Sequence, residues 1–95
     1  MSAGTGVLHY ESNTADVETH FFQIWVLPRT DNMEPSYEQR PVLGMATNNN
    51  LILLVSPDGR DDSLSINQDV LLCKINPGQL PTRVKLDPHR CQFFR

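Results

Sequence analysis

The sequence lacks three features that would quickly indicate a class of protein: clustered cysteines, a long apolar run and a block of basic residues. Its two cysteines, Cys73 and Cys91, stand eighteen residues apart without a C-x-x-C pair, which favours free, half-buried strand thiols over a disulfide or a zinc site. No stretch reaches the ~18 apolar residues of a membrane span. The start also lacks the basic and apolar regions of a secretory signal. We therefore expect a cytoplasmic chain without a membrane segment.

Positive charge is scarce, since 8 Lys and Arg stand against 11 Asp and Glu for a net charge of −3. A chain with this balance lacks the electrostatic footprint of a protein that binds nucleic acid or an anionic membrane. The charges are unevenly placed: residues 1–28 hold three acids and no base, whereas residues 83–95 hold four bases and one acid. The two ends could attract each other within one chain or between chains, although ordinary surface scatter gives the same pattern. The residues concerned are Glu11, Asp16, Glu18, Arg83, Lys85, Asp87, Arg90 and Arg95.

Motifs for covalent catalysis and nucleotide binding are also missing. No serine stands in a G-x-S-x-G setting, and Cys73 has no histidine beside it in the sequence. The G-T-G at residues 4–6 is too short for a phosphate-binding loop and does not open a helix. The sequence thus argues against a serine or cysteine hydrolase and against a nucleotide-binding protein.

The chain does contain short apolar segments separated by Gly, Pro and Asn turns. Residues 20–27, HFFQIWVL, are apolar on both alternating faces and predict a strand buried on both sides, which Pro28 would end. Because no apolar segment follows the 3.6-residue period of a helix, we predict an all-β sandwich or barrel. The Pro-Asp-Gly turn at 57–59 predicts a hairpin between two of these strands. Further strands are expected at 51–55, 63–66, 69–75, 82–86 and 91–94.

Four motifs, MSAGTGVLHYE, HFFQIWVLP, SYEQR and SPDGRDDSLSINQDVLL, together resemble the central part of the pirin family. Pirins are quercetin 2,3-dioxygenase-like cupins with two β-barrels in tandem, and the resemblance covers most of residues 1–75. It implies that residues 1–28 form the end of a first cupin-like module, 29–49 a connector and 50–95 the start of a second. We expect residues 1–95 to form one cupin-derived domain. Its partial or composite β-barrel or sandwich would be completed by dimerisation, because a half barrel exposes sheet edges.

The resemblance also implies a metal site. In the family, a mononuclear iron is bound by two histidines of an upstream His-x-His strand and by a His and a Glu at the positions of His9 and Glu11. Residues i and i+2 of a strand face the same side, so this pair could bind one divalent ion, with Fe, Ni and Zn as the candidates. The His-x-His has no counterpart here, because the remaining histidines, His20 and His89, form no such pair. We expect His20 at the rim of a core and His89 in a surface turn.

Three functional hypotheses explain the incomplete ligand set in different ways. The leading hypothesis is a pirin-like cupin that is a non-catalytic binding module of unknown small-molecule ligand, or a vestigial one. The alternative is a metal-dependent, quercetinase-like dioxygenase in which His9 and Glu11 share a metal with a partner in a homodimer, or with water. A third hypothesis is a truncated reading frame that folds without a selected activity.

Overall fold

Strand β2, Leu51–Ser56, is the centre of the sheet in the computed structural model, which describes residues 1–42, 47–48, 51–76 and 83–94. It pairs with β1 (Thr47–Asn48), β3 (Leu64–Ser65) and β4 (Leu72–Ile75). Ile52 pairs with both β1 and β4, and Val55 pairs with both β3 and β4. Strands β1 and β3 therefore share the edge of β2 that lies opposite β4.

The all-β prediction is confirmed, because the one helical segment among the described residues is a single 3-10 turn, η1 (Arg60–Asp62). The predicted strands at 51–55 and 63–66 appear as β2 and β3, and the strand predicted at 69–75 begins later, at Leu72. The described sheet is open rather than closed into a barrel. No helix within residues 1–42, 51–76 or 83–94 is long and apolar enough to cross a membrane.

The pairing of β2 with β4 provides the small core. The two strands run antiparallel from Leu51 opposite Ile75 to Val55 opposite Leu72, with an irregularity between Leu53 and Val55. Ile52 is 5% exposed and is the one buried apolar residue among those described. Burying one such side chain contributes about 1.5–3 kcal/mol, so this core by itself stabilises the fold only weakly.

The predicted hairpin after β2 is wrong, because β3 runs parallel to β2. A hairpin reverses the chain once, whereas the segment between Ser56 and Leu64 makes a full loop and returns beside Val55. The loop is possible because Gly59, Asp61 and Asp62 take left-handed backbone angles, with φ of 68°, 55° and 60°. Glycine and aspartate are among the residues that tolerate this conformation.

Three predicted strands do not form within the part of the chain that the structure describes. Residues 20–27 and 91–94 are irregular and exposed, and so are residues 83–86, while Thr82 lies outside the described residues. The prediction of a strand buried on both faces at 20–27 is therefore wrong for this chain: Trp25 is 85% exposed and Leu27 86%. A strand needs a neighbouring strand to satisfy its main-chain groups, and the described sheet, with β2 flanked on both edges, offers this segment no place beside its central strand.

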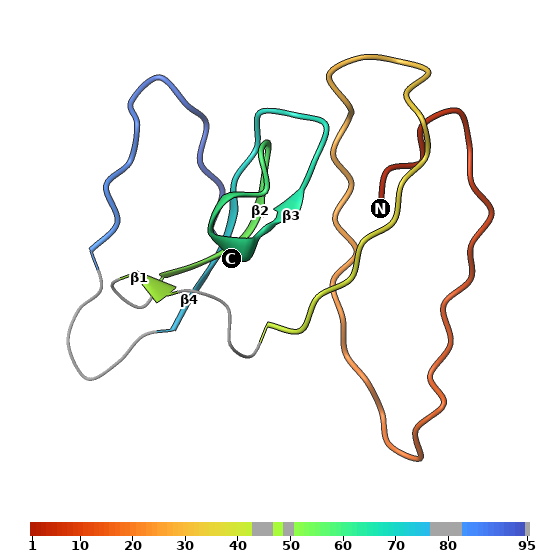
Figure 1. Ribbon diagram of the computed structural model, residues 1–95. Helices are drawn as coiled ribbons and strands as arrows, with labels where there is room; N and C mark the ends of the chain where they lie inside the picture. The colour runs from red at the N-terminus through yellow and green to blue at the C-terminus, as the bar shows by residue number, and fades with distance from the viewer. Residues whose placement is uncertain (43–46, 49–50, 77–82, 95) are drawn as a thin grey trace.

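The long segments lie to either side of the sheet (Figure 1). Residues 1–42 form loops on one side, and residues 83–94 form a loop on the opposite side. Hydrogen bonds hold the first group to the segments that flank β3. The Arg29 amide donates to the Asn67 carbonyl at 2.7 Å, Gln68 Nε2 donates to the Leu27 carbonyl at 3.1 Å, and Arg40 Nη1 donates to the Asp62 carbonyl at 3.0 Å. The radius of gyration is 15.4 Å, against about 12 Å for a compact domain of this length. The chain is thus expanded.

Candidate functional site

The two predicted metal ligands, His9 and Glu11, lie at the same concavity. It has a volume of about 470 Å³ and is formed where residues 7–11 approach residues 35–37. Both side chains are exposed, as is Tyr10 between them. The expected strand is absent at this point, and consecutive residues line the concavity instead of alternating away from it. The lining residues are Met1, Val7, Leu8, His9, Tyr10, Glu11, Pro35, Ser36 and Tyr37.

Backbone contacts near the N-terminus build this concavity. The Ser2 amide donates to the Ser36 carbonyl at 2.7 Å, and the Ser36 amide donates back to Ser2 at 3.0 Å. Gly4, with φ of 52°, lets the chain turn there. A Cβ at Gly4 would collide with the Met33 carbonyl oxygen and lie 2.7 Å from the Pro35 nitrogen. Glycine is required at this close approach because it has no Cβ and accepts a positive φ.

The donor set at the concavity consists of one imidazole and one carboxylate. His20 and His89 do not line it, and no group of three His, Cys, Asp or Glu residues comes together within the described ranges. Residues 43–46, 49–50, 77–82 and 95 include none of these four residue types. A non-haem iron site uses two histidines and a carboxylate, so the residues of one chain do not fit that metal. The assignment of His9 and Glu11 as metal ligands stays a prediction.

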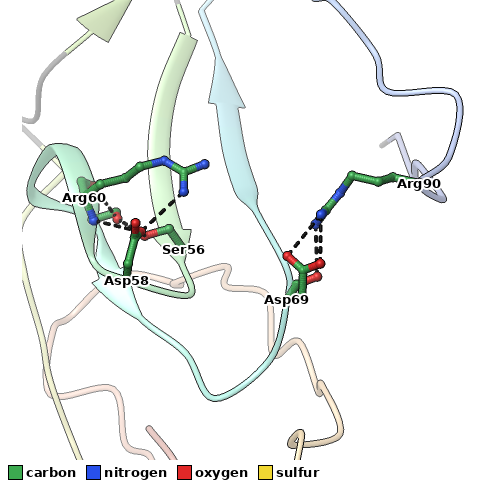
Figure 2. Close-up of polar contacts among 6 residues, drawn as sticks. Ser56, Asp58, Arg60, Asp69 and Arg90 are labelled. Atoms are coloured by element: carbon green, nitrogen blue, oxygen red, sulfur yellow. Dashed lines mark hydrogen bonds and ion pairs between the residues drawn. The ribbon is translucent and has the colours of Figure 1, made fainter.

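A second polar cluster, which the sequence reasoning missed, lies in the loop between β2 and β3. Ser56 and Ser63 are 0% and 1% exposed, and their hydroxyl oxygens are 2.7 Å apart. Ser63 Oγ donates to the Arg60 carbonyl at 2.6 Å, and Ser56 Oγ donates to Asp58 Oδ1 at 3.1 Å. Figure 2 shows Ser56 and Arg60 converging on Asp58. The signal in the sequence was the pair of serines that bracket the Pro-Asp-Gly turn.

Asp58 is the charged centre of this loop. The Arg60 backbone amide holds the pKa of the Asp58 carboxyl below its ordinary value, and the Ser56 hydroxyl and the Arg60 guanidinium act in the same direction, while desolvation opposes them. Arg60 Nη1 lies 3.3 Å from Asp58 Oδ1. Because the two buried hydroxyls have their partners inside the loop, the cluster stabilises the conformation of the loop.

One ion pair joins the loop before β4 to the C-terminal segment (Figure 2). Arg90 Nη1 contacts both carboxylate oxygens of Asp69, at 3.0 and 2.9 Å, and Arg90 Nη2 donates to the Asp69 carbonyl at 3.0 Å. Both side chains are partly exposed, so the pair contributes at most about 1 kcal/mol. This contact cannot be predicted from the sequence pattern, because the partners are 21 residues apart.

The prediction of free thiols is confirmed for Cys73 and Cys91, but the expected half-burial is wrong because both are exposed, and Cys91 does not lie on a strand. Cys73 lies on β4, opposite Leu53. Desolvation raises the pKa of its thiol, and nearby Arg60 lowers it by less. Because the thiolate is the reactive form of cysteine, a raised pKa makes Cys73 a weak nucleophile at neutral pH.

Comparison with known proteins confirms the resemblance to the pirin-like cupins. The chain is 42% identical over 73 residues to a quercetin 2,3-dioxygenase of Escherichia coli K12. It is 38% identical over 73 residues to a putative quercetin 2,3-dioxygenase of Pasteurella multocida, and 34% identical over 83 residues to one of Zymomonas mobilis. These matches cover 76%, 76% and 84% of the chain. The chain spans only 30 to 35% of the length of these relatives. No family profile and no solved structure matches it.

Proposed function

We propose that this chain, which resembles the central part of the pirin-like cupins, is a non-catalytic binding module whose ligand contacts the concavity at His9 and Glu11. The observation that carries the proposal is the donor set: the concavity offers one imidazole, one carboxylate and two tyrosines, but too few metal ligands for the chemistry of a dioxygenase. Metal catalysis also needs a shaped, dry cavity, whereas His9 and Glu11 are exposed.

The lining of the concavity suits a flat, partly polar molecule. Tyr10 and Tyr37 are 89% and 72% exposed, and Leu8 is fully exposed. Aromatic faces supply contact area for a planar ligand, while Glu11 can accept hydrogen bonds from hydroxyl groups. A polyhydroxylated aromatic compound has this chemistry. Quercetin is a suitable probe because the relatives carry its name.

The experiment is a titration of the tag-free chain with quercetin, observed by amide NMR. We expect shifts at residues 7–11 and 35–37, no consumption of dioxygen, and binding at least fivefold weaker in Tyr10→Ala. Lys74→Ala, on the exposed surface of β4, is the matched control and should bind normally. Unshifted resonances at residues 7–11 and 35–37 would refute the proposal.

The alternative is a quercetinase-like dioxygenase whose metal is shared between two chains. It is favoured by the placement of His9 and Glu11 at one concavity, because a partner chain's histidines could complete the set. Elemental analysis after exposure to Fe²⁺, Ni²⁺ or Zn²⁺ tests it. Near-stoichiometric metal that is lost in His9→Ala and in either His20→Ala or His89→Ala, together with dioxygen uptake on quercetin, would establish the alternative. Trace metal that is unchanged in all three variants would exclude it.

A further inference from the structure

The protein exposes much more apolar surface than a stable monomer of its size normally does. Phe21 and Trp25 are 66% and 85% exposed, and Phe93 and Phe94 near the other end are 89% and 66% exposed. Since each aromatic side chain presents about 150–250 Å², these four alone expose roughly 600 Å². A standard interface buries about 800 Å² on each partner. The exposed aromatic side chains therefore nearly suffice for a stable association.

The segment that contains Phe21 and Trp25 and the segment that contains Phe93 and Phe94 carry opposite charges. We call residues 11–27 the acidic arm, because it contains Glu11, Asp16 and Glu18 and no Lys or Arg. We call residues 83–94 the basic arm, because it contains Arg83, Lys85 and Arg90 against Asp87. Arg90 is already paired with Asp69. No salt bridge between described residues involves any of the other charged residues of the two arms.

The two arms of one chain extend away from the sheet on opposite sides. Figure 1 shows the acidic arm among the loops on one side of β2 and β3, and the basic arm in the loop on the opposite side. The Asp69–Arg90 ion pair holds the basic arm to the loop before β4. The hydrogen bond from Gln68 Nε2 to the Leu27 carbonyl holds the end of the acidic arm to the loop after β3. Within one chain the arms are anchored at the neighbouring residues Gln68 and Asp69, and no salt bridge between described residues joins them. A second copy can present a complementary arm along the full length of each.

We propose that the acidic arm of one copy packs against the basic arm of a second copy, and reciprocally, so that the chain forms a two-fold homodimer. In such a dimer each contact is made twice, once by each protomer. The aromatic side chains supply the buried area, and the opposite charges of Asp16 and Glu18 against Arg83 and Lys85 select the pairing and accelerate the encounter. The proposal is independent of whether the concavity binds a ligand.

Charge-reversal variants test the pairing. Asp16→Lys/Glu18→Lys makes both arms basic, and Arg83→Glu/Lys85→Glu makes both arms acidic. Mass is measured by light scattering across a size-exclusion peak over a hundredfold range of protein concentration. We expect the native chain to be a dimer, and each variant alone to dissociate at a concentration at least tenfold higher than the native chain.

The decisive sample is the equimolar mixture of the two variants, in which both arm contacts are again between opposite charges. We expect this mixture to form a heterodimer of near-native affinity. The control is Asp31→Lys/Glu34→Lys, an equal charge change on exposed residues outside both arms, which should leave the mass unchanged. The single tryptophan, Trp25, gives an independent readout, because its fluorescence should shift to the blue on association.

Three results would overturn the proposal. These are a native chain that stays monomeric at all concentrations, a dimer that both reversal variants retain, and a mixture that fails to associate although each variant gives a native circular dichroism spectrum. The first would leave the arms to another occupant, and the second would place the interface elsewhere on the molecule.

Discussion

Replacing Ser63 with alanine should destabilise the protein by about 1–2 kcal/mol. Ser63 is 1% exposed; its hydroxyl donates to the Arg60 carbonyl at 2.6 Å and lies 2.7 Å from the Ser56 hydroxyl. Alanine removes both contacts, whereas the Ser63 amide still donates to the Arg60 carbonyl at 3.1 Å and the Ser56 hydroxyl can still donate to Asp58. Because both groups keep a partner, the expected cost is the net loss of hydrogen bonds, each about 0.5–1.5 kcal/mol.

The number of hydroxyl protons in the cluster adds a second expectation, for the double variant. Ser56 and Ser63 have two hydroxyl protons for three contacts: to the Arg60 carbonyl, between the hydroxyls, and to Asp58. If Ser63 donates to Arg60, the Ser56 proton is shared between Ser63 and Asp58. Each single variant loses the contact between the two hydroxyls, so the sum of the single costs counts that contact twice. The variant Ser56→Ala/Ser63→Ala should therefore cost at least about 0.5 kcal/mol less than the sum of the single variants.

Urea unfolding followed by far-ultraviolet circular dichroism measures these energies, at one fixed protein concentration so that association does not vary. The midpoint should fall and the slope should stay the same, because the surface exposed on unfolding is unchanged. Ser65→Ala is the control: Ser65 is exposed on β3, and its change should stay within about 0.5 kcal/mol. A Ser63→Ala cost of less than about 0.5 kcal/mol, or strict additivity of the two serine variants, would refute the proposed network.

Three further predictions concern other contacts. Gly4→Ala should destabilise the folded chain by at least about 1 kcal/mol and reduce the hydrogen-exchange protection of the Ser36 amide. Gly6→Ala is the control for backbone strain alone, because Gly6 has φ of 134° but no atom within 4 Å of an added Cβ. Equal effects of the two variants on hydrogen exchange would contradict the steric argument. Folding lowers the pKa of Asp58, so the stability that its carboxylate contributes is present above its ordinary pKa of 3.8 and is lost as the pH falls through the lower folded value. Asp58→Asn should therefore lose less stability on acidification than the native chain in urea titrations. An unchanged pH profile of stability would contradict this expectation. Arg90→Lys, which keeps the charge but not the forked contact, should speed amide exchange in residues 83–94 about twofold, as expected for a loss of a few tenths of a kcal/mol.

The sequence predicted those strands that find a partner within the chain. The aliphatic run at 51–55 and the apolar segment before Ile75 became β2 and β4 because they pair with each other. Residues 20–27 have an even stronger strand pattern, but a pattern specifies a tendency and a ladder requires a neighbour. The parallel return to β3 was unpredictable for another reason: aspartate is compatible with right-handed and left-handed backbone, and only the loop as a whole decides between them at Asp61 and Asp62.

The candidate site, like the sheet, was predicted only in part from the sequence. Sequence resemblance placed His9 and Glu11 together, and the structure puts both at one concavity. The remaining ligands were out of reach, because they would have to come from outside the chain. The serine cluster and the Asp69–Arg90 pair were missed because they depend on how loops fold back, over seven and 21 residues.

The incomplete donor set and the uncovered aromatic residues can be tested together, because one dimer would affect both. If the arms pack antiparallel, with Arg83 and Lys85 opposite Asp16 and Glu18, the partner's His89 would lie toward Glu11 and His9. If that histidine completes a metal site, metal content should fall together with dimer content in the two charge-reversal variants and recover in their mixture. If the concavity is a binding site without metal, quercetin should shift residues 7–11 equally in dimer and monomer. Metal that stays bound in the dissociated variants would show that metal binding does not depend on the dimer. The arms would then have a purely structural role.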